Sequence, residues 1–267
     1  MTDPPPDDAA RTFLVGGSDY DSFMGRYSGP LAALFADAAG VRAGQDALDV
    51  GCGPGALTGV LVARLGAASV GACDPSDTFV EECAERCPGV TVRAGRAEAI
   101  PFDRARFDRV LAQLVMHFVA DPDRAMREFA RVLRPGGIAA ACVWDFSEGR
   151  EMLRSFWDAA TALDPAAPDE ARRLRFGRSG ELSELFERGG FQDVRETTLQ
   201  VSSTYTGFEE LWAGFLRGIG PAGSYCVGLG APARGRLRGA LFDRLGSPDG
   251  PFTLGAVARC ATGRAPR

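Results

Sequence analysis

The segment Leu48–Gly55, which reads LDVGCGPG, decides the fold of this chain. A short apolar run ends there in three alternating glycines, Gly51, Gly53 and Gly55, and an amphipathic stretch follows at 56–65. Glycine lets the backbone bend sharply and lets a ligand approach without meeting a Cβ atom. In open α/β sheets, ligands bind in the crevice beyond the carboxyl ends of the strands, where such a turn lies. The segment therefore predicts an α/β fold with a ligand site at this turn.

Strands and helices are expected to alternate around this segment. Short apolar runs predict strands at 46–50, 69–73, 90–94, 108–111 with a continuation through 114–119, and 138–144. Amphipathic stretches predict helices at 30–39, 56–65, 77–87 and 122–133. In the last of these, Asp121 can cap the N-terminus and Pro122 suits the first helical position. Continuous apolar strands separated by helices are typical of a parallel sheet covered on both faces.

The pattern changes after residue 145. Helices are predicted at 148–162, 179–188, 208–217 and 234–245, strands at 194–201 and 253–260, and a Gly-rich, aromatic stretch lies at 218–230. A helical insertion between two late strands would form a lid or a substrate wall. No linker is evident, so we expect a flexible leader at 1–19 and a single domain at 20–267. Within that domain, 20–145 would bind the cofactor and 146–267 would supply substrate-side helices and the last strands.

The second predicted strand ends in Asp74, 23 residues after Gly51. A carboxylate at this place can accept hydrogen bonds from both hydroxyls of a ribose, so the ligand is expected to contain a nucleoside. Gly51-x-Gly53-x-x-Ala56 also matches the dinucleotide fingerprint, which leaves an NAD-dependent oxidoreductase as an alternative. Asp49, two residues before Gly51, would repel a pyrophosphate but would suit the cationic S-adenosylmethionine.

Residue counts exclude several chemistries. All 30 basic residues are arginine, so no Schiff-base or P-loop lysine is available. Because His117 is the single histidine, a zinc site built on two or three histidines is excluded. A Cys₄ zinc site is disfavoured because no C-x-x-C pair occurs, so no metal is expected. The seven cysteines are expected to be reduced and buried. The net charge of −5 without a basic stripe disfavours a nucleic-acid partner. No apolar run reaches the ~18 residues of a membrane span and no signal peptide is evident, so a cytoplasmic protein is expected.

A set of motifs in this order resembles a known family. They are D-V-G-C-G-P-G at 49–55, Asp74, A-E-A-I-P-F at 97–102, F-D-R-V at 107–110, His117 and R-V-L-R-P-G-G at 131–137. The chain resembles the class I S-adenosylmethionine-dependent methyltransferases of type 11, the ubiquinone-biosynthesis-like branch, strongly over about residues 20–144. The resemblance implies a Rossmann-like, seven-stranded sheet in which only the last strand is antiparallel. It also implies methyl transfer from S-adenosylmethionine to oxygen, nitrogen or an activated carbon of a small-molecule acceptor.

The resemblance further implies roles for residues at matching positions. The methionine half of the cofactor would be lined by Asp49, Gly51, Cys52, Gly53 and Gly55, the ribose by Asp74, Pro75 and Ser76, the adenine by Arg96 and Ala97, and the region of the sulfonium by Gln113 and Leu114. An N-terminal segment with Tyr20, Met24 and Arg26 would fold over the cofactor, and Arg26 could meet its carboxylate. Arg96 departs from the acid that the family often has here, so either a backbone carbonyl accepts from the adenine amino group or Arg96 stacks on the ring.

Two readings stay open for His117 and for several aromatic residues. His117 could act as a general base or orient the acceptor, or it could be packed between Met116 and Phe118. Four aromatic side chains, Trp144, Trp212, Phe215 and Tyr225, could line an acceptor pocket or belong to the core. Arg234, Arg236 and Arg238 are expected to form a solvated helix face. A cofactor-binding scaffold without catalysis is a second alternative for the whole chain, and the oligomeric state is undetermined.

Overall fold

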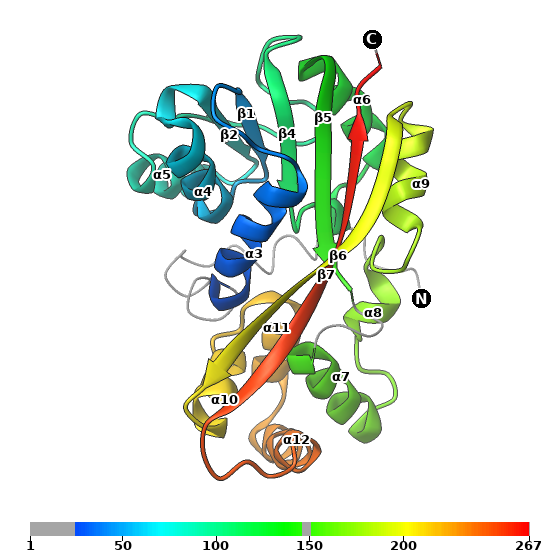
Figure 1. Cartoon of the computed structure of the whole chain (residues 1–267). Coiled ribbons are helices and arrows are strands. Elements are labelled where there is room, and N and C mark those ends of the chain that lie inside the picture. Colours follow the sequence, from blue (N-terminus) through cyan, green and yellow to red (C-terminus); the bar gives the residue numbers. More distant parts are fainter. Residues whose placement is uncertain (1–24, 146–150, 267) are drawn as a thin grey trace.

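A seven-stranded sheet forms the centre of the molecule (Figure 1). The computed structural model describes residues 25–145 and 151–266. The strands are β1 (Ala47–Val50), β2 (Val70–Asp74), β3 (Thr91–Ala94), β4 (Phe107–Gln113), β5 (Leu133–Trp144), β6 (Gln192–Tyr205) and β7 (Phe252–Arg264). They lie in the order β3-β2-β1-β4-β5-β7-β6, and β7 is antiparallel to both of its neighbours while the pairs from β3 to β5 are parallel. The predicted fold class, including the single antiparallel last strand, is confirmed.

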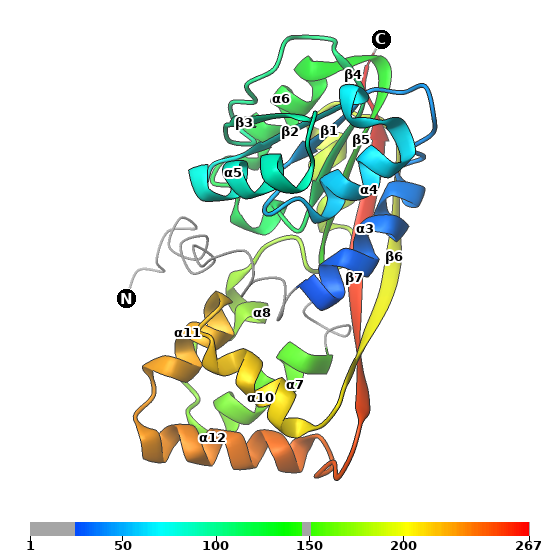
Figure 2. The ribbon, with the colours of Figure 1, turned by 90° about the vertical axis from the view of Figure 1, so that its left-hand side faces the viewer.

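Helices cover both faces of the sheet and create two separate cores (Figures 1 and 2). Helices α3 (Arg26–Ala38) and α4 (Ala56–Leu65) bury residues such as Phe35 and Leu61 against one face, and α5 (Asp77–Arg86) packs near β2 and β3. Helices α6 (Pro122–Val132) and α9 (Glu181–Arg188) bury Phe129 and Leu185 against the other face. The central strands β1 and β2 and the second half of β5 are buried on both faces, which explains why they read as continuous apolar runs, whereas the edge strands β3 and β6 are largely exposed.

Local sequence explains where the helices begin. The side chain of Asp121 accepts a hydrogen bond from the Arg124 backbone N–H at 2.9 Å, and Pro122 occupies the first helical position of α6. Ser76 caps α5 in the same manner, through the Phe79 backbone N–H. These side chains satisfy backbone donors that a helix leaves unpaired at its first turn. A 3₁₀ turn, η2 (Ala67–Ser69), leads into β2.

The predicted continuation of the fourth strand through 114–119 is wrong. Strand β4 ends at Gln113, Leu114 adopts the left-handed region with φ 63°, and the 3₁₀ turn η3 (Met116–Phe118) follows. The apolar residues that suggested a strand are nevertheless buried, with Met116 fully covered and Val119 5% exposed. An apolar run reports burial, and periodicity alone cannot separate a short buried turn from a strand.

The second half of the chain builds a helical group at one end of the sheet (Figures 1 and 2). It contains α7 (Glu151–Leu163), α8 (Glu170–Arg173), α10 (Phe208–Leu216), α11 (Gly220–Gly228) and α12 (Ala231–Arg244). Strands β6 and β7 are paired from Gln192↔Arg264 to Tyr205↔Phe252, whereas β5 pairs only with Ala258–Arg264. The outer part of this hairpin therefore extends past β5 and carries α10–α12, the expected insertion between two late strands. No helix in the described part of the chain is long and apolar enough to cross a bilayer.

Candidate cofactor and acceptor site

The three glycines after β1 each adopt a positive φ, of 74° at Gly51, 51° at Gly53 and 97° at Gly55. A Cβ atom at Gly51 would lie 2.4 Å from Cγ2 of Val115, so the turn and the segment after β4 are in close contact there. A Cβ atom at Gly53 would have no heavy atom within 4 Å. Gly51 is therefore required by packing, whereas Gly53 faces space that a ligand can occupy.

Asp74 holds the glycine turn in place. Its Oδ2 accepts a hydrogen bond from the Gly53 backbone N–H and its Oδ1 accepts one from the Ser76 backbone N–H, both at 2.9 Å. The carboxylate is 6% exposed, and burial raises its pKa above the ordinary value although the two backbone donors counteract this. Each oxygen retains a second lone pair, so the contact with ribose hydroxyls that the sequence predicts is compatible with this geometry.

Asp49 is a buried acid that has no cationic partner among residues 25–145 and 151–266. It is 1% exposed, and its Oδ2 accepts a hydrogen bond of 2.7 Å from the hydroxyl of Thr58. Its Oδ1 has no hydrogen-bond partner among the described residues. Burial raises the pKa of Asp49 to about 8, an effect that the Thr58 hydrogen bond partly offsets. A positively charged ligand beside this carboxyl would satisfy its free oxygen and stabilise its ionised form.

Two further buried polar atoms lack partners near the carboxyl end of β4. The side-chain Nε2 of Gln113 donates to the backbone oxygen of Ser28 at 3.0 Å, which joins β4 to α3. The Oε1 of Gln113 and the Oγ of Ser28 have no partner among the described residues. Asp49 lies opposite Leu111 in the β1–β4 register, so Gln113 is two residues further toward the same edge of the sheet. Buried polar atoms are normally paired, and here they fit a ligand with ammonium and hydroxyl donors.

The remaining residues expected around the cofactor lie in varied surroundings. Ala97 is buried, whereas the side chain of Arg96 is half exposed and its Nε lies 3.8 Å from a Glu98 oxygen. The guanidinium of Arg26 pairs with Glu210 at 2.7 Å and lies 4.1 Å above the ring of Tyr205. Arg26 thus joins α3 to α10. Its guanidinium is engaged by Glu210, so the expected contact with the cofactor carboxylate would require it to share or leave this ion pair. Cys52 is buried, Pro75 and Ser76 follow β2, and Leu114 has a positive φ after β4. The predicted positions Tyr20 and Met24 lie outside the described residues.

His117 is buried, and both of its ring nitrogens bind backbone atoms. Its Nε2 accepts from the Trp144 backbone N–H at 3.1 Å, and its Nδ1 lies 2.6 Å from the backbone oxygen of Arg175. Because a backbone N–H can only donate, the proton of the neutral ring is on Nδ1, which donates to the Arg175 carbonyl. This arrangement ties β5 and the loop after α8 to η3. It favours the packing role over the general-base role that the sequence left open.

The four aromatic residues considered for an acceptor pocket belong to one apolar cluster. Trp144, Trp212 and Phe215 are buried, and Tyr225 is partly buried against the same cluster. Phe215 stacks on Phe156 with ring centroids 4.3 Å apart. The geometry favours their core role. All seven cysteines are free and buried, as expected. Within residues 25–145 and 151–266, no group of His, Cys, Asp and Glu side chains could hold a metal ion.

Comparison with known proteins agrees with this site. Residues 48–141 match the family described as Methyltransferase domain. Over this region the chain carries a methyltransferase domain and is similar to class I methyltransferases of type 11, and its fold is that of methyltransferases solved with S-adenosylmethionine or S-adenosylhomocysteine. The resemblance to methyltransferases of type 11 is thereby confirmed, and the ligand site at the glycine turn stays a prediction.

Individual relatives are similar over limited regions. The chain is 31% identical over 150 residues to 2-methyl-6-phytyl-1,4-hydroquinone methyltransferase 2, chloroplastic, of Oryza sativa subsp. japonica, which covers 55% of this chain and 39% of that protein. A solved structure of a candidate type II methyltransferase from Anaeromyxobacter dehalogenans has a TM-score of 0.63 and 23% identity, covering 90% and 97% of the two chains. Phosphoethanolamine N-methyltransferase 2 of Haemonchus contortus, solved with S-adenosyl-L-methionine, has a TM-score of 0.54 and 16% identity, covering 89% of this chain and 53% of that one. The chain spans less than half the length of the first curated relatives that it matches.

The sequence patterns did not predict several residues of the site. Thr58 and Ser28 are buried polar residues inside helices that otherwise read as apolar or small, and this contrast was the available signal. Val115 contacts Gly51 because the chain turns after β4, where the apolar pattern predicts a strand. The arginine-rich stretch 172–178 was overlooked, although its density of positive charge is visible in the sequence.

Proposed function

We propose that this methyltransferase transfers a methyl group from S-adenosylmethionine to a small-molecule acceptor at oxygen, nitrogen or an activated carbon. The observation that carries the proposal is Asp49, a fully buried acid with a free oxygen beside the glycine turn. The cofactor is cationic, and its sulfonium supplies an electrophilic methyl group with a good leaving group.

The chain's own residues have distinct tasks in this proposal. The Asp49 carboxylate balances the positive charge of the cofactor, and Asp74 accepts hydrogen bonds from the ribose while it holds the Gly53 N–H. Gln113 and Ser28 offer buried acceptors from β4 and α3. Methyl transfer from a sulfonium is an in-line displacement, so holding the two reactants in line and excluding water supply most of the catalysis. A general base is not required, which agrees with the fully bonded His117 ring.

Binding measurements test the cofactor part of the proposal. We expect S-adenosylmethionine and S-adenosylhomocysteine to bind in the micromolar range by calorimetry, and NAD not to bind. NAD binding in the absence of any S-adenosylhomocysteine signal would instead support the oxidoreductase alternative. Asp49 argues against that outcome, because a pyrophosphate would lie near an acid.

Turnover separates an enzyme from a cofactor-binding scaffold. The expected result is release of S-adenosylhomocysteine, detected by mass spectrometry, when candidate small acceptors are added to the loaded protein. Tight cofactor binding with no acceptor methylated would favour the scaffold. We further infer a cytoplasmic setting, because seven free, buried cysteines suit a reducing compartment.

A further inference from the structure

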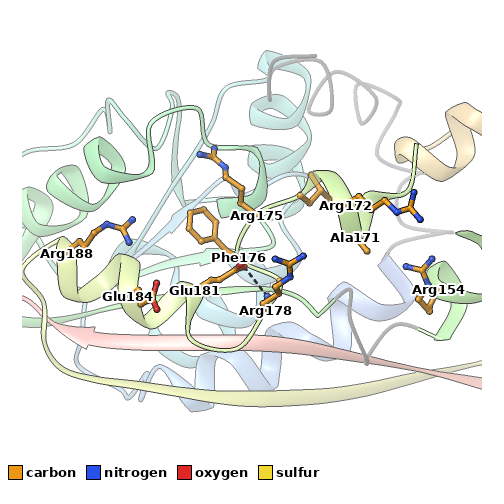
Figure 3. A pocket seen from close by; sticks show the side chains of 11 residues that line it. Arg154, Ala171, Arg172, Arg175, Phe176, Arg178, Glu181, Glu184 and Arg188 are labelled. Carbon is orange, nitrogen blue, oxygen red and sulfur yellow. Dashed lines mark hydrogen bonds between the residues drawn. The ribbon is translucent and has the colours of Figure 1, made fainter. Parts of the chain in front are cut away.

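A cavity of about 510 Å³ lies beside α7, α8, the loop at 174–178 and α9 (Figure 3). Its volume falls within the ~300–1,000 Å³ of small-molecule sites. Five arginines and two glutamates line it, so its lining has three more positive than negative charges, although the whole chain has a net charge of −5. Figure 3 shows the guanidinium groups spread across the cavity, from Arg154 on one side to Arg188 on the other.

The arginines differ in how far their charge is already balanced. Arg154 pairs with Asp158 at 2.7 Å and with Asp169 at 2.9 Å, and Arg188 lies 3.4 Å from Asp123. Arg172 and Arg178 are exposed and form no ion pair within the described part of the chain. Two unpaired guanidinium groups on one concave surface are the natural partners of an oxyanion, which they can bind through parallel N–H donors.

Arg175 contributes to the cavity mainly through its backbone and its position. Its guanidinium donates to the Val119 backbone oxygen and lies 5.6 Å from the Phe176 ring centroid. The negative groups on the lining are Glu181 and Glu184 of α9, and Oε2 of Glu181 accepts from the Arg178 backbone N–H at 3.1 Å. The charge that remains for a ligand is therefore concentrated on Arg172 and Arg178, because Arg154 and Arg188 are paired with aspartates.

The loop that carries Arg178 is held by contacts on each side. Besides the Arg175–His117 bond, the Gly177 backbone oxygen accepts from Nε of Arg259 at 3.2 Å, and the Gly180 N–H donates to Glu196 at 3.0 Å. Phe176 is kept at φ 68°, a strained conformation for a residue with a bulky side chain, and is 8% exposed. Such strain persists only where surrounding contacts impose it, and it concentrates at functional sites.

The cavity also borders the reaction side of the sheet. Arg175 binds His117 of η3 and the backbone oxygen of Val119 just after η3, and η3 begins two residues after Leu114 at the end of β4. Phe176 and Leu174 add an apolar part to the lining. A ligand in this cavity therefore lies against the segment from which the acceptor is expected to approach the cofactor.

We propose that this cavity is an acceptor subsite that binds an anionic group, a carboxylate or a phosphate, through Arg172 and Arg178. The proposal rests on the methyltransferase function proposed above and narrows its substrate class to acceptors with an oxyanion and an apolar body.

The binding test uses inorganic phosphate and benzoate as probes of the two anion sources. Wild-type protein loaded with S-adenosylhomocysteine is titrated with each probe at constant ionic strength set by sodium chloride, and melting temperature and arginine side-chain NMR shifts are followed. We expect saturable binding of at least one probe, and affinity about tenfold weaker or worse in Arg172→Gln/Arg178→Gln. The matched control, Arg104→Gln/Arg127→Gln, removes two exposed arginines outside the cavity and is expected to bind as the wild type.

Each outcome of the binding test either supports or overturns the anion subsite. Equal binding by the cavity variant and the wild type, an equal loss in the control variant, or no saturable binding of either probe would overturn the subsite. Which probe binds distinguishes a carboxylate from a phosphate. Cofactor binding is measured separately, so a protein that binds the anion but not S-adenosylhomocysteine would refute the proposed function and leave the anion site standing.

A kinetic test links the anion to catalysis. Candidate acceptors are compared as free acids and as their methyl esters, with S-adenosylhomocysteine release as the readout. We expect the acids to be the better acceptors, and Arg172→Gln/Arg178→Gln to raise KM about tenfold or more while kcat changes little. Preferred turnover of the esters would contradict the proposal.

Discussion

Asp49 combines complete burial with a carboxylate oxygen that no described residue contacts. Its pKa of about 8 means that the folded protein without cofactor holds a proton that the unfolded chain releases above the ordinary value near 4. Burial is the largest cause of the raised pKa, Cys83 and Asp74 add to it, and the hydrogen bonds of Thr58 oppose it. Buried acids of this kind mark functional sites more often than structural ones.

For Asp49→Asn we expect a change in the pH dependence of stability. Because folding raises its pKa, the contribution of Asp49 is fully present below about pH 4 and is lost as the pH rises toward 8, by up to about 1.4 kcal/mol per pH unit. The asparagine variant should lack this fall, as urea unfolding between pH 5 and 8.5 would measure. Asp243→Asn, which removes an exposed carboxylate on α12, is the control. Parallel pH profiles for wild type and Asp49→Asn would show that the carboxyl is not protonated in the folded state.

Asp74→Ala should weaken binding of S-adenosylhomocysteine by about 1–3 kcal/mol, the range for lost hydrogen bonds to a charged acceptor. Part of the loss arises because the Gly53 and Ser76 N–H groups lose their acceptor. Calorimetry on a folded variant measures it, with Asp77→Ala on the first turn of α5 as the neighbouring control. An unchanged affinity would refute the ribose role.

His117→Ala should reduce stability more than rate. The substitution leaves the Trp144 N–H and the Arg175 carbonyl without their partner and creates a cavity, at a cost of about 1–3 kcal/mol. Melting temperature and single-turnover rate, measured on the same preparation, separate the roles. A stable variant whose kcat falls by about 10²–10⁴ would identify His117 as a general base instead.

The glycine turn shows how one element serves both packing and binding. Gly51 is pressed against Val115 of the segment after β4, while Gly53 lies open and donates its N–H to Asp74. The two glycines share a positive φ, but their surroundings differ completely. The turn therefore couples the end of β1 to the ends of β2 and β4, where the cofactor is expected.

Alanine substitutions at these two glycines should have different effects. Gly51→Ala places a Cβ 2.4 Å from Val115, so we expect a large loss of stability, partly recovered by Val115→Ala. Gly53→Ala costs about 1–2 kcal/mol of backbone strain and should chiefly reduce cofactor affinity. Thermal unfolding and calorimetry on both variants would measure this. Equal loss of stability with unchanged cofactor binding would contradict an open ligand position at Gly53.

The molecule as a whole is joined across its two ends by the β6–β7 hairpin and α3. The hydroxyls of Tyr27 and Tyr205 lie 3.1 Å apart in the interior, and Arg26 pairs with Glu210 at the start of α10. The apolar cluster on the α3 face continues into α7 and α10–α12 without interruption. The helical group is thus packed onto the half of the molecule where the cofactor is expected, which suits a wall for an acceptor.

Glu210→Gln should loosen this connection. The backbone and hydroxyl of Thr206 and the Arg26 guanidinium lower the pKa of Glu210 to about 2. A lowered pKa means that the stabilisation is present above the ordinary value near 4.5 and is lost as the pH falls toward 2. We expect faster hydrogen exchange in α10 at neutral pH and a smaller loss of stability on acidification than in the wild type. Glu209→Gln, which breaks the neighbouring pair with Arg238, is the control.

Apart from the strand predicted at 114–119 and the start of β5, the expected strands and helices of the first half agree with the structure within a few residues, and the reason is local. Alternating apolar and amphipathic runs, the cap at Asp121 and the glycines at 51–55 each carry their signal within a short window. The positions of Asp49 and Asp74 at strand ends follow from the same signals. The family resemblance supplied the order and direction of the late strands.

Only the tertiary structure decided which side chains meet. The roles of His117 and the late aromatic residues depend on partners far away in sequence, such as the Arg175 carbonyl 58 positions from His117. Arg26 could be assigned to the cofactor or to α10 only once α10 was in place. The arginine cavity likewise exists because α7 and α9 bring Arg154 and Arg188 to the arginine-rich stretch at 172–178. Local patterns specify elements through short-range backbone preferences, whereas burial, ion pairing and a cavity arise from packing between elements that the sequence separates.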